Sequence, residues 1–361
     1  MKHIIYNLGV RSKKAFTQQI NTYRKNKVLK DYCNLIKKNK NLIIKENNKD
    51  INNAIKIKLK DNLIKRLILD KKKILDIVNS IKKIIKLKDP TYNIIEKWKR
   101  PNGLKFLKVS IPIGVIGVIY ESRPNVTSDV ASLCFKSGNV AILKGGSEAF
   151  YSNKILSNLF RKALKLNKVD QNYLQFINIK SRKVVDFLLT KMSKFIDVII
   201  PRGGKNLVKK VQSLSTIPII GHLEGVCHSY VDKDADPKIA SKVILNAKLR
   251  NTAICGATET ILLHRNIIKK IGVSILKSLE EEGCKIIGDS KIKKIYKGKI
   301  KKATIKDWSK EYLSPIVSVK SVQNLKEAIA HINKYGTMHT DCIITKNKSS
   351  ARKFLSEIKS S

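Results

Sequence analysis

The stretch VSIPIGVIGVIY, residues 109–120, decides the fold class of this chain. It is rich in β-branched residues and almost without polar ones, which is typical of a strand buried on both faces of a parallel sheet. The run is too short, and too often interrupted by Pro and Gly, to span a bilayer. Gly114 and Gly117 lie inside it, where close backbone packing is the simplest explanation. We therefore expect a central strand here.

Strands and helices alternate on the carboxyl side of this stretch. The segment NVAILKGG, residues 139–146, is predicted to be the next strand, and the helix after it is predicted to have Ser147 as its N-cap. Strand–helix alternation implies a parallel sheet covered on both faces. Further strands are expected in residues 173–179, 195–204 and 216–221, and helices in residues 147–166, 181–192 and 205–215.

A second alternating series begins near His222, so a domain boundary is predicted near residue 221. By contrast, residues 1 to about 98 carry apolar residues at threes and fours and are predicted to be helical. Strands of the second series are expected in residues 227–231, 258–264, 315–322 and 341–345, and helices in residues 237–249, 266–283, 324–336 and 349–359.

The composition is that of a globular protein with an unusual charge. The chain has 361 residues, enough for two domains, and 42% of them are hydrophobic. The net charge of +46 arises from 74 Lys and Arg against 28 Asp and Glu. The excess is mainly Lys and is spread along the whole chain, whereas nucleic-acid sites concentrate basic residues and rely on Arg. We therefore expect no nucleic-acid partner, although the charge should attract anionic metabolites.

Neither a targeting segment nor a cysteine framework is evident. The N-terminus has a basic start but no sustained apolar core, which predicts a soluble, cytoplasmic protein with no membrane partner. The six cysteines include no C-x-x-C pair. This spacing argues against a structural zinc and against a disulfide framework, so no metal is expected.

Glycine turns follow two strands of the first series. LKGGSE, residues 143–148, and PRGGKN, residues 201–206, each place two glycines at a strand end. Ligands of parallel sheets bind beyond the carboxyl ends of the strands, where glycines allow close approach to the backbone. The two turns together predict an anionic ligand, although G-x-G-x-x-G is absent.

Three side chains outside these turns could take part in chemistry, and each has a simpler explanation. Cys255 lies in LRNTAICGATET, residues 249–260, but isolated cysteines are more often packed in a core. Asn125 could donate to an oxyanion, or could satisfy its own turn. Glu224 has apolar neighbours, where a carboxylate is costly unless it is paired or catalytic. The residue types alone leave these alternatives open.

The order of several longer blocks resembles one family. These blocks resemble the glutamate-5-semialdehyde dehydrogenases, also called gamma-glutamyl phosphate reductases, of the aldehyde dehydrogenase superfamily. The resemblance covers essentially the whole chain and is strongest over residues 109–345. The blocks are IPIGVIGVIYESRPNVTSDVASLCFKSGNVAILKGGSE (111–148), IIPRGGKNL (199–207), IPIIGHLEGVCHSYVDKDAD (217–236), NAKLRNTAICGATETILLHR (246–265) and EYLSPIVSVKSV (311–322).

The resemblance implies a fold class and a reaction. It implies an aldehyde dehydrogenase-like α/β fold with two Rossmann-like parallel-sheet domains and an N-terminal helical segment. Residues 1–220 would hold these helices and the NADP-binding domain, and residues 221–361 the catalytic domain. The implied reaction is the NADPH-dependent reduction of gamma-glutamyl 5-phosphate to glutamate 5-semialdehyde, with release of phosphate, in proline biosynthesis.

The resemblance also implies roles for single residues. Cys255 matches the nucleophile that forms a thioester and then a thiohemiacetal, Asn125 lies in the segment of the oxyanion-hole asparagine, and Glu224 matches the general-base glutamate. Arg123, Arg202 and Arg250 are alternatives for binding the substrate phosphate. The residues that would bind NADP(H) are Lys144, Ser147, Glu148, Gly203, Gly204 and Glu311.

Other expectations concern partners and alternatives. A homo-oligomer is expected, with the upstream glutamate kinase as a candidate partner. The family has a further strand and a glycine-rich stretch beyond residue 361, so the C-terminus is predicted to be truncated.

Cys227 is the second candidate nucleophile, and the remaining cysteines are assigned to packing. A CoA-acylating aldehyde dehydrogenase and a non-catalytic, polyanion-binding basic protein are the alternative functions.

Overall fold

The computed structural model describes residues 2–121, 123–181 and 183–361. The chain forms two compact units, Met1–Gly221 and His222–Ser361, here called unit 1 and unit 2. Each unit contains a parallel sheet with helices packed on it, so the predicted α/β fold class is confirmed. None of the described helices is long and apolar enough to cross a membrane.

Unit 1 is built on a four-stranded parallel sheet. Its strand order is β5-β4-β3-β6, and β3 and β4 are buried along their entire length. The predicted central strand is therefore β3. An added Cβ at Gly114 would lie 2.1 Å from the Asp197 carboxylate, so a side chain, and not the backbone, packs closely against this glycine. The strands are β3 (Val115–Tyr120), β4 (Val140–Gly145), β5 (Leu174–Phe176) and β6 (Val198–Arg202).

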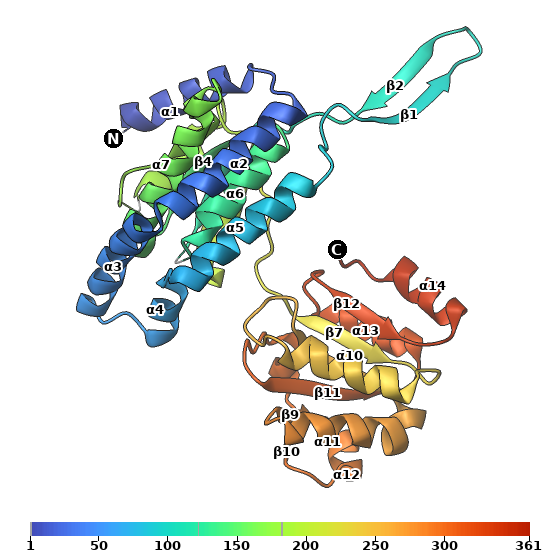
Figure 1. Ribbon diagram of the computed structural model, residues 1–361. Coiled ribbons are helices and arrows are strands. Elements are labelled where there is room, and N and C mark those ends of the chain that lie inside the picture. The colour runs from blue at the N-terminus through green and yellow to red at the C-terminus, as the bar shows by residue number, and fades with distance from the viewer. Residues whose placement is uncertain (1, 122, 182) are drawn as a thin grey trace. The chain divides into compact units, whose positions relative to one another are not determined.

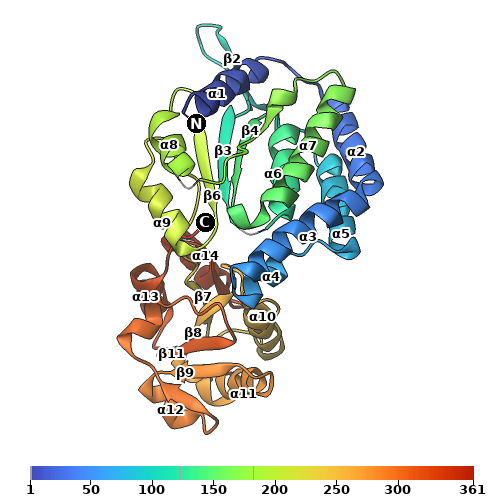
Figure 2. The ribbon, with the colours of Figure 1, turned by 90° about the vertical axis from the view of Figure 1, so that its left-hand side faces the viewer.

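Helices cover both faces of this sheet. Figure 2 shows α6 and α7 beside β3 and β4, with α2 and α5 outside them, and α8 and α9 on the side of β6. The N-terminal region is helical up to residue 86, largely as predicted. The helices are α1 (Lys2–Phe16), α2 (Thr22–Lys38), α3 (Lys40–Lys56), α4 (Asp61–Leu67), α5 (Lys71–Lys86), α6 (Asn125–Lys136), α7 (Phe150–Leu166), α8 (Lys183–Lys191) and α9 (Lys205–Leu214).

A β-hairpin was missed in the segment predicted to be helical. Strands β1 (Ile94–Lys99) and β2 (Lys105–Val109) pair antiparallel and form the arm that projects from the helices of unit 1 in Figure 1. Every residue of both strands is exposed, so burial imposes no alternation on the sequence. The sequence of the turn nonetheless contains a pattern that is typical of β-hairpins. Asn102 and Gly103 form an Asn-Gly pair, and Gly103 has φ +89°.

Two further local predictions are wrong. Residues 216–221 form no strand, because only Ile219 bridges to Ile199 there. Ser147 is not a helix N-cap, since it begins a short 3₁₀ helix (Ser147–Ala149) and α7 begins at Phe150. A distant side chain caps α7 instead. The Asp50 carboxylate of α3 accepts hydrogen bonds from the backbone N–H groups of Tyr151 (3.1 Å) and Ser152 (2.8 Å).

Unit 2 contains a six-stranded sheet in the order β10-β9-β11-β8-β7-β12, and every pair is parallel. Two separate groups of buried apolar side chains pack against it. Asp236 and Pro237 begin α10 as N-cap and first helical residue. The strands are β7 (Cys227–Val231), β8 (Thr258–His264), β9 (Lys285–Gly288), β10 (Ile300–Lys302), β11 (Ile316–Val322) and β12 (Asp341–Ile344).

The helices of unit 2 follow the predicted alternation with one irregularity. The helix expected over residues 266–283 begins as a 3₁₀ turn (Arg265–Ile267) and a π-helical turn (Ile268–Gly272) before it becomes α11. The segment between residues 285 and 302, for which no element was predicted, supplies β9, α12 and β10. The helices are α10 (Pro237–Leu249), α11 (Val273–Glu281), α12 (Ser290–Ile295), α13 (Leu325–Tyr335) and α14 (Lys348–Glu357).

Candidate active site

One edge of the sheet in unit 2 gathers four side chains that are candidates for the active site. Because the strands are parallel, their amino ends lie at one edge of the sheet. The loops that lead into β7, β8, β11 and β12 therefore all end at this edge. These loops carry Glu224, Cys255, Glu311 and His339, respectively. Three of these residues were predicted from the sequence. The amino edge of the sheet, and not the carboxyl edge, is therefore the candidate catalytic edge of unit 2.

Cys255 lies in the loop between α10 and β8 and is half-buried. The carbonyl of Ile254 accepts a hydrogen bond from the N–H of Ala257 at 3.1 Å, so Cys255 is the second residue of a tight turn. The backbone N–H of Cys255 makes no hydrogen bond within the described residues. A thiol and an N–H donor are thus both available in this turn.

Of the other five cysteines, four are buried and Cys342 is half-buried. Burial raises the pKa of each of their thiols, to about 12 for Cys227 and about 11 for Cys284. A protonated thiol is a poor nucleophile, because the thiolate is the reactive form. These surroundings suit the packing role predicted for Cys33, Cys134, Cys284 and Cys342.

Gly225 follows Glu224 in the chain and contacts the loops that carry Cys255 and Glu311. Its N–H donates a hydrogen bond to Oε1 of Glu311 at 3.0 Å. A Cβ built on Gly225 would lie 1.9 Å from the carbonyl oxygen of Cys255. Glu224 precedes Gly225 and is half-buried. The structure therefore brings the three predicted residues of unit 2 into one neighbourhood.

Two residues of the loop before β12 were missed by the sequence analysis. The Thr337 hydroxyl accepts a hydrogen bond from the N–H of Val226 at 3.0 Å. Nδ1 of His339 lies 3.7 Å from the Cys227 thiol, and burial lowers the pKa of His339. The strand predicted at 341–345 could have indicated this loop, because parallel strands begin at one edge.

The carboxyl edge of the sheet in unit 1 carries the predicted dinucleotide residues. Lys144 is the next-to-last residue of β4 and is only 6% exposed, and among the described residues its ammonium makes one hydrogen bond, to the carbonyl of Gly145 at 2.9 Å. Burial lowers the pKa of Lys144, and the nearby Glu148 carboxylate opposes that shift. Ser147 is exposed and Glu148 half-buried in the following 3₁₀ helix. Lys144 therefore keeps donors for a further acceptor.

The glycine turn after β6 holds a carboxylate of the protein itself. Oε2 of Glu121 accepts a hydrogen bond from the N–H of Gly204, the N-cap of α9, at 2.8 Å. A Cβ on Gly203 would lie 2.7 Å from the Glu121 carboxyl carbon. The helix N-terminus thus attracts an anion, and a side chain of the same unit supplies it.

Asn125 is the first residue of α6 and is exposed, instead of lying in a loop. Its side-chain amide donates a hydrogen bond to the Asp129 carboxylate at 3.1 Å. Burial raises the pKa of Asp129, while the bond from Asn125 lowers it. The Asn125 amide has a second N–H that could donate elsewhere.

Comparison with known proteins identifies the family. The family model described as aldehyde dehydrogenase family matches residues 11–289. The chain belongs to the aldehyde dehydrogenase family. A gamma-glutamyl phosphate reductase from Thermodesulfovibrio yellowstonii is 42% identical over 363 residues, covering 100% of this chain and 86% of the relative.

Solved structures agree with this assignment. The crystal structure of a gamma-glutamyl phosphate reductase from Thermotoga maritima has a TM-score of 0.93 and 36% identity, covering 98% of this chain and 86% of that one. An acetylating aldehyde dehydrogenase from Geobacillus thermoglucosidasius has a TM-score of 0.68 at 16% identity, with 99% and 85% covered. This second likeness shows the shared aldehyde dehydrogenase fold alone.

The carboxyl edge of unit 1 suits the nicotinamide cofactor of the aldehyde dehydrogenase family. The buried Lys144 ammonium has donors left for oxygen acceptors. The N-terminus of α9 binds the Glu121 carboxylate, which shows that an anion is favoured there. The residues present therefore fit a phosphate-bearing dinucleotide.

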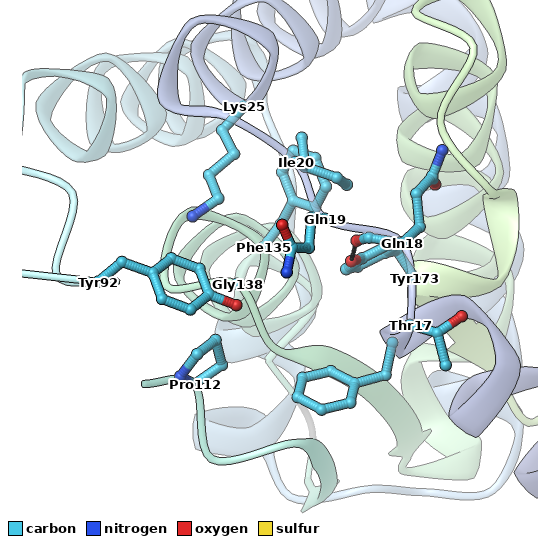
Figure 3. Close-up of a pocket in the computed structure, with 11 residues that line it drawn as sticks. Thr17, Gln18, Gln19, Ile20, Lys25, Tyr92, Pro112, Phe135, Gly138 and Tyr173 are labelled. Carbon is cyan, nitrogen blue, oxygen red and sulfur yellow. Dashed lines mark hydrogen bonds between the residues drawn. The ribbon is translucent and has the colours of Figure 1, made fainter. Parts of the chain in front are cut away.

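A separate pocket of about 290 Å³ in unit 1 contains none of the predicted site residues. Figure 3 shows Lys25, Tyr92, Pro112 and Gly138 around it. The Lys25 ammonium is already paired with the Asp89 carboxylate at 3.0 Å. This pocket lies near the start of β4, at the opposite end of that strand from Lys144.

Proposed function

We propose that this chain reduces gamma-glutamyl 5-phosphate to glutamate 5-semialdehyde, with release of phosphate, in proline biosynthesis. It is an oxidoreductase of the aldehyde dehydrogenase family. Relatives that carry the reductase name align with nearly the whole chain at about 42% identity. The observation that carries the proposal is the half-buried Cys255, set in a turn beside Glu224 and Glu311 at one sheet edge.

Thiolate chemistry suits an acyl phosphate because a thiolate is both a strong nucleophile and a good leaving group. In the proposed reaction, the Cys255 sulfur bonds to the γ-acyl carbon and the bond from that carbon to the phosphate oxygen breaks. A thioester and inorganic phosphate result. Bound NADPH would supply the hydride that converts the thioester to a thiohemiacetal. The thiohemiacetal then releases the semialdehyde and returns the thiol.

The surrounding groups would stabilise charge and move protons. An oxyanion forms on the acyl oxygen in both steps, and we assign the N–H of Cys255, which has no partner among the described residues, as one donor for it. We assign Asn125 as the second donor, through the amide N–H that does not bond Asp129. Each such donor contributes a few kcal/mol to rate acceleration. We assign Glu224 to proton transfer at the Cys255 thiol, because water activation by this carboxylate would hydrolyse the thioester.

We propose that the nicotinamide cofactor is NADP(H). Lys144 and Glu148 would hold the adenosine ribose, with Ser147 beside them, and the ammonium would favour a 2′-phosphate. Gly203 and Gly204 would let the pyrophosphate approach the start of α9, and Glu311 would hold the nicotinamide ribose. Units 1 and 2 are thus proposed as the NADP-binding and catalytic domains.

Three arginines remain alternatives for the substrate phosphate. Arg202 and Arg250 are exposed and Arg123 is half-buried. We further propose a cytoplasmic homo-oligomer. Because acyl phosphates hydrolyse readily, the kinase that makes this substrate is a plausible partner for direct transfer.

The reaction run backwards tests cofactor, substrate and nucleophile together. Glutamate 5-semialdehyde, NADP⁺ and phosphate are mixed with the full chain, and NADPH formation is followed by absorbance. The proposal predicts turnover that requires phosphate. Turnover that requires CoA in place of phosphate would support a CoA-acylating aldehyde dehydrogenase. No turnover, together with salt-sensitive binding of a polyanion such as heparin, would support the non-catalytic alternative.

A further inference from the structure

The carbonyl group of Cys255 lies where a side chain at position 225 would be. A Cβ on Gly225 would be 1.9 Å from the carbonyl oxygen of Cys255, 2.7 Å from its carbonyl carbon and 3.0 Å from its Cα. Contacts this short do not occur between real atoms, so any side chain here must displace backbone. Gly225 is therefore required for close approach, and the atoms that approach it belong to the proposed nucleophile itself.

A thiol contacts the same carbonyl from a second direction. Sγ of Cys227 donates a hydrogen bond to the carbonyl oxygen of Cys255 at 3.1 Å. Cys227 is 2% exposed, and burial raises its pKa to about 12, so its sulfur keeps the proton it donates. Water cannot easily replace this donor at a buried site.

Strand pairing holds both contacts in place. Cys227 is the first residue of β7 and pairs with Thr258, the first residue of β8. The loop of Cys255 therefore ends directly beside Cys227. Gly225 is also fixed, because its N–H donates to Glu311. The peptide that follows Cys255 cannot rotate without breaking one of these contacts.

We infer that Cys227 is a positioning residue, which together with Gly225 fixes the peptide of Cys255 and so directs its sulfur toward the acyl carbon. This inference rests on the proposed function, in which Cys255 is the nucleophile. Misplacement of a reacting group by about 1 Å can cost a hundredfold in rate. A cysteine that only fills space would instead affect stability, and a hydroxyl in its place would not restore activity.

Three variants of the full chain separate positioning from packing. Cys227→Ala removes the donor, and Cys227→Ser keeps a donor with a shorter reach. Cys342→Ala is the matched control, because the Cys342 thiol also donates to an oxygen, Oγ of Ser229 at 3.3 Å, but that oxygen is not on the Cys255 loop. The measurements are kcat and KM for semialdehyde-dependent NADP⁺ reduction, and the rate at which iodoacetamide labels Cys255, located by peptide mass spectrometry.

We expect Cys227→Ala to lower kcat about tenfold with the KM for NADP⁺ unchanged, as loss of one buried hydrogen bond predicts. Cys227→Ser should recover kcat to within about threefold of the wild type, and Cys342→Ala should stay within about twofold. Cys227→Ala should also label Cys255 at least threefold faster, because the loop is loosened. Wild-type kcat and labelling in Cys227→Ala, or a Cys227→Ser protein as impaired as Cys227→Ala, would overturn the inference.

Labelling keeps the inference separate from the proposed reaction. If the wild type reduces no NADP⁺, the proposed function fails, and the labelling rates still decide whether Cys227 positions Cys255.

Gly225→Ala is a harsher version of the same test. Its Cβ must displace the Cys255 carbonyl, so we expect a loss of kcat of about a hundredfold or more. The two Cys227 variants decide the inference if Gly225→Ala fails to fold.

Discussion

The two sheets place their candidate site residues at opposite ends of their strands. In unit 1 they lie at the carboxyl ends, because Lys144 is the next-to-last residue of β4 and Gly204 comes after β6. In unit 2 they precede the strands, as Cys255 precedes β8 and Glu311 precedes β11. The edge in unit 1 is proposed to present donors to the cofactor, whereas the edge in unit 2 is tied together by internal hydrogen bonds.

This difference follows from what each edge is proposed to do. A binding edge must leave donors and helix N-termini open to a ligand. A nucleophile must be held in one geometry, because catalysis depends on its direction. A buried ion pair flanks the Cys255 loop in unit 2. Lys248 of α10 and Glu259 of β8 lie on either side of the Cys255 loop, with 2.6 Å between their charged atoms.

The largest effect is expected at Cys255. Cys255→Ala removes the proposed nucleophile, so kcat should fall by roughly 10⁴-fold or more, while the dissociation constant for NADPH stays unchanged. Steady-state rates and NADPH fluorescence titration check the two parts. Cys342→Ala, at another half-buried cysteine of unit 2, should keep its rate. An active Cys255→Ala protein would refute the mechanism.

The second-largest effect is expected on the stability of unit 2, at the ion pair that flanks the Cys255 loop. Lys248→Met leaves the buried Glu259 carboxylate without its partner, which should lower the free energy of unfolding by about 3–5 kcal/mol. Urea titration measures this change. Lys346→Met breaks the exposed pair with Asp236 and should leave the free energy of unfolding nearly unchanged. Equal effects of the two substitutions would show that burial of the Lys248–Glu259 pair has no special role.

In unit 1 we expect an effect on binding alone. Lys144→Ala should raise the dissociation constant for NADPH by roughly 10- to 100-fold through loss of a charged donor, with the thermal midpoint little changed. Lys154→Ala, an exposed lysine of α7, is the control. Unaltered NADPH affinity in Lys144→Ala would remove Lys144 from the site.

Lys144 should also make NADPH binding depend on pH. Because burial lowers the pKa of Lys144, its ammonium is lost at a lower pH than that of an ordinary lysine. NADPH binding should therefore weaken as the pH rises through this lowered pKa. Lys144→Arg, which stays charged, should show a flatter profile.

The smallest effect is expected at Glu121. If the cofactor's pyrophosphate binds at the N-terminus of α9 as proposed, the Glu121 carboxylate would compete with it, so Glu121→Gln should tighten NADPH binding by about two- to fivefold. The exposed Glu96 of the hairpin offers a control with the same change of charge. Weaker binding in Glu121→Gln would mean that this carboxylate contacts the cofactor and does not compete with it.

Sequence reasoning succeeded where burial imposes a pattern. The continuous apolar runs of β3 and β4 predicted buried parallel strands, and both are buried throughout. The hairpin of Trp98 and Phe106 was missed because both of its faces are exposed and its rings stack on each other, 5.2 Å apart. Ser147 was assigned as an N-cap because local sequence cannot show that Asp50, about a hundred positions away, caps α7.

The candidate site was only partly predictable for a similar reason. Cys255, Glu224 and Glu311 were found by resemblance to a family, since residue type alone made packing the commoner explanation for Cys255 and left the role of Glu224 open. The roles of Gly225 and Cys227 depend on distances of 1.9 and 3.1 Å to one carbonyl oxygen, which no motif records. His339 was missed because the predicted strand at 341–345 was not used to place its preceding loop at the same edge as Cys255.

The most direct test of the central claim is to trap the acyl group on Cys255. The full chain is mixed with glutamate 5-semialdehyde and NADP⁺ without phosphate, quenched in acid within seconds, and mapped by peptide mass spectrometry. The proposed mechanism predicts one NADPH formed per active chain and a glutamyl group on the peptide that contains Cys255. A glutamyl group on Cys227, or continued turnover with Cys255 unmodified, would contradict it.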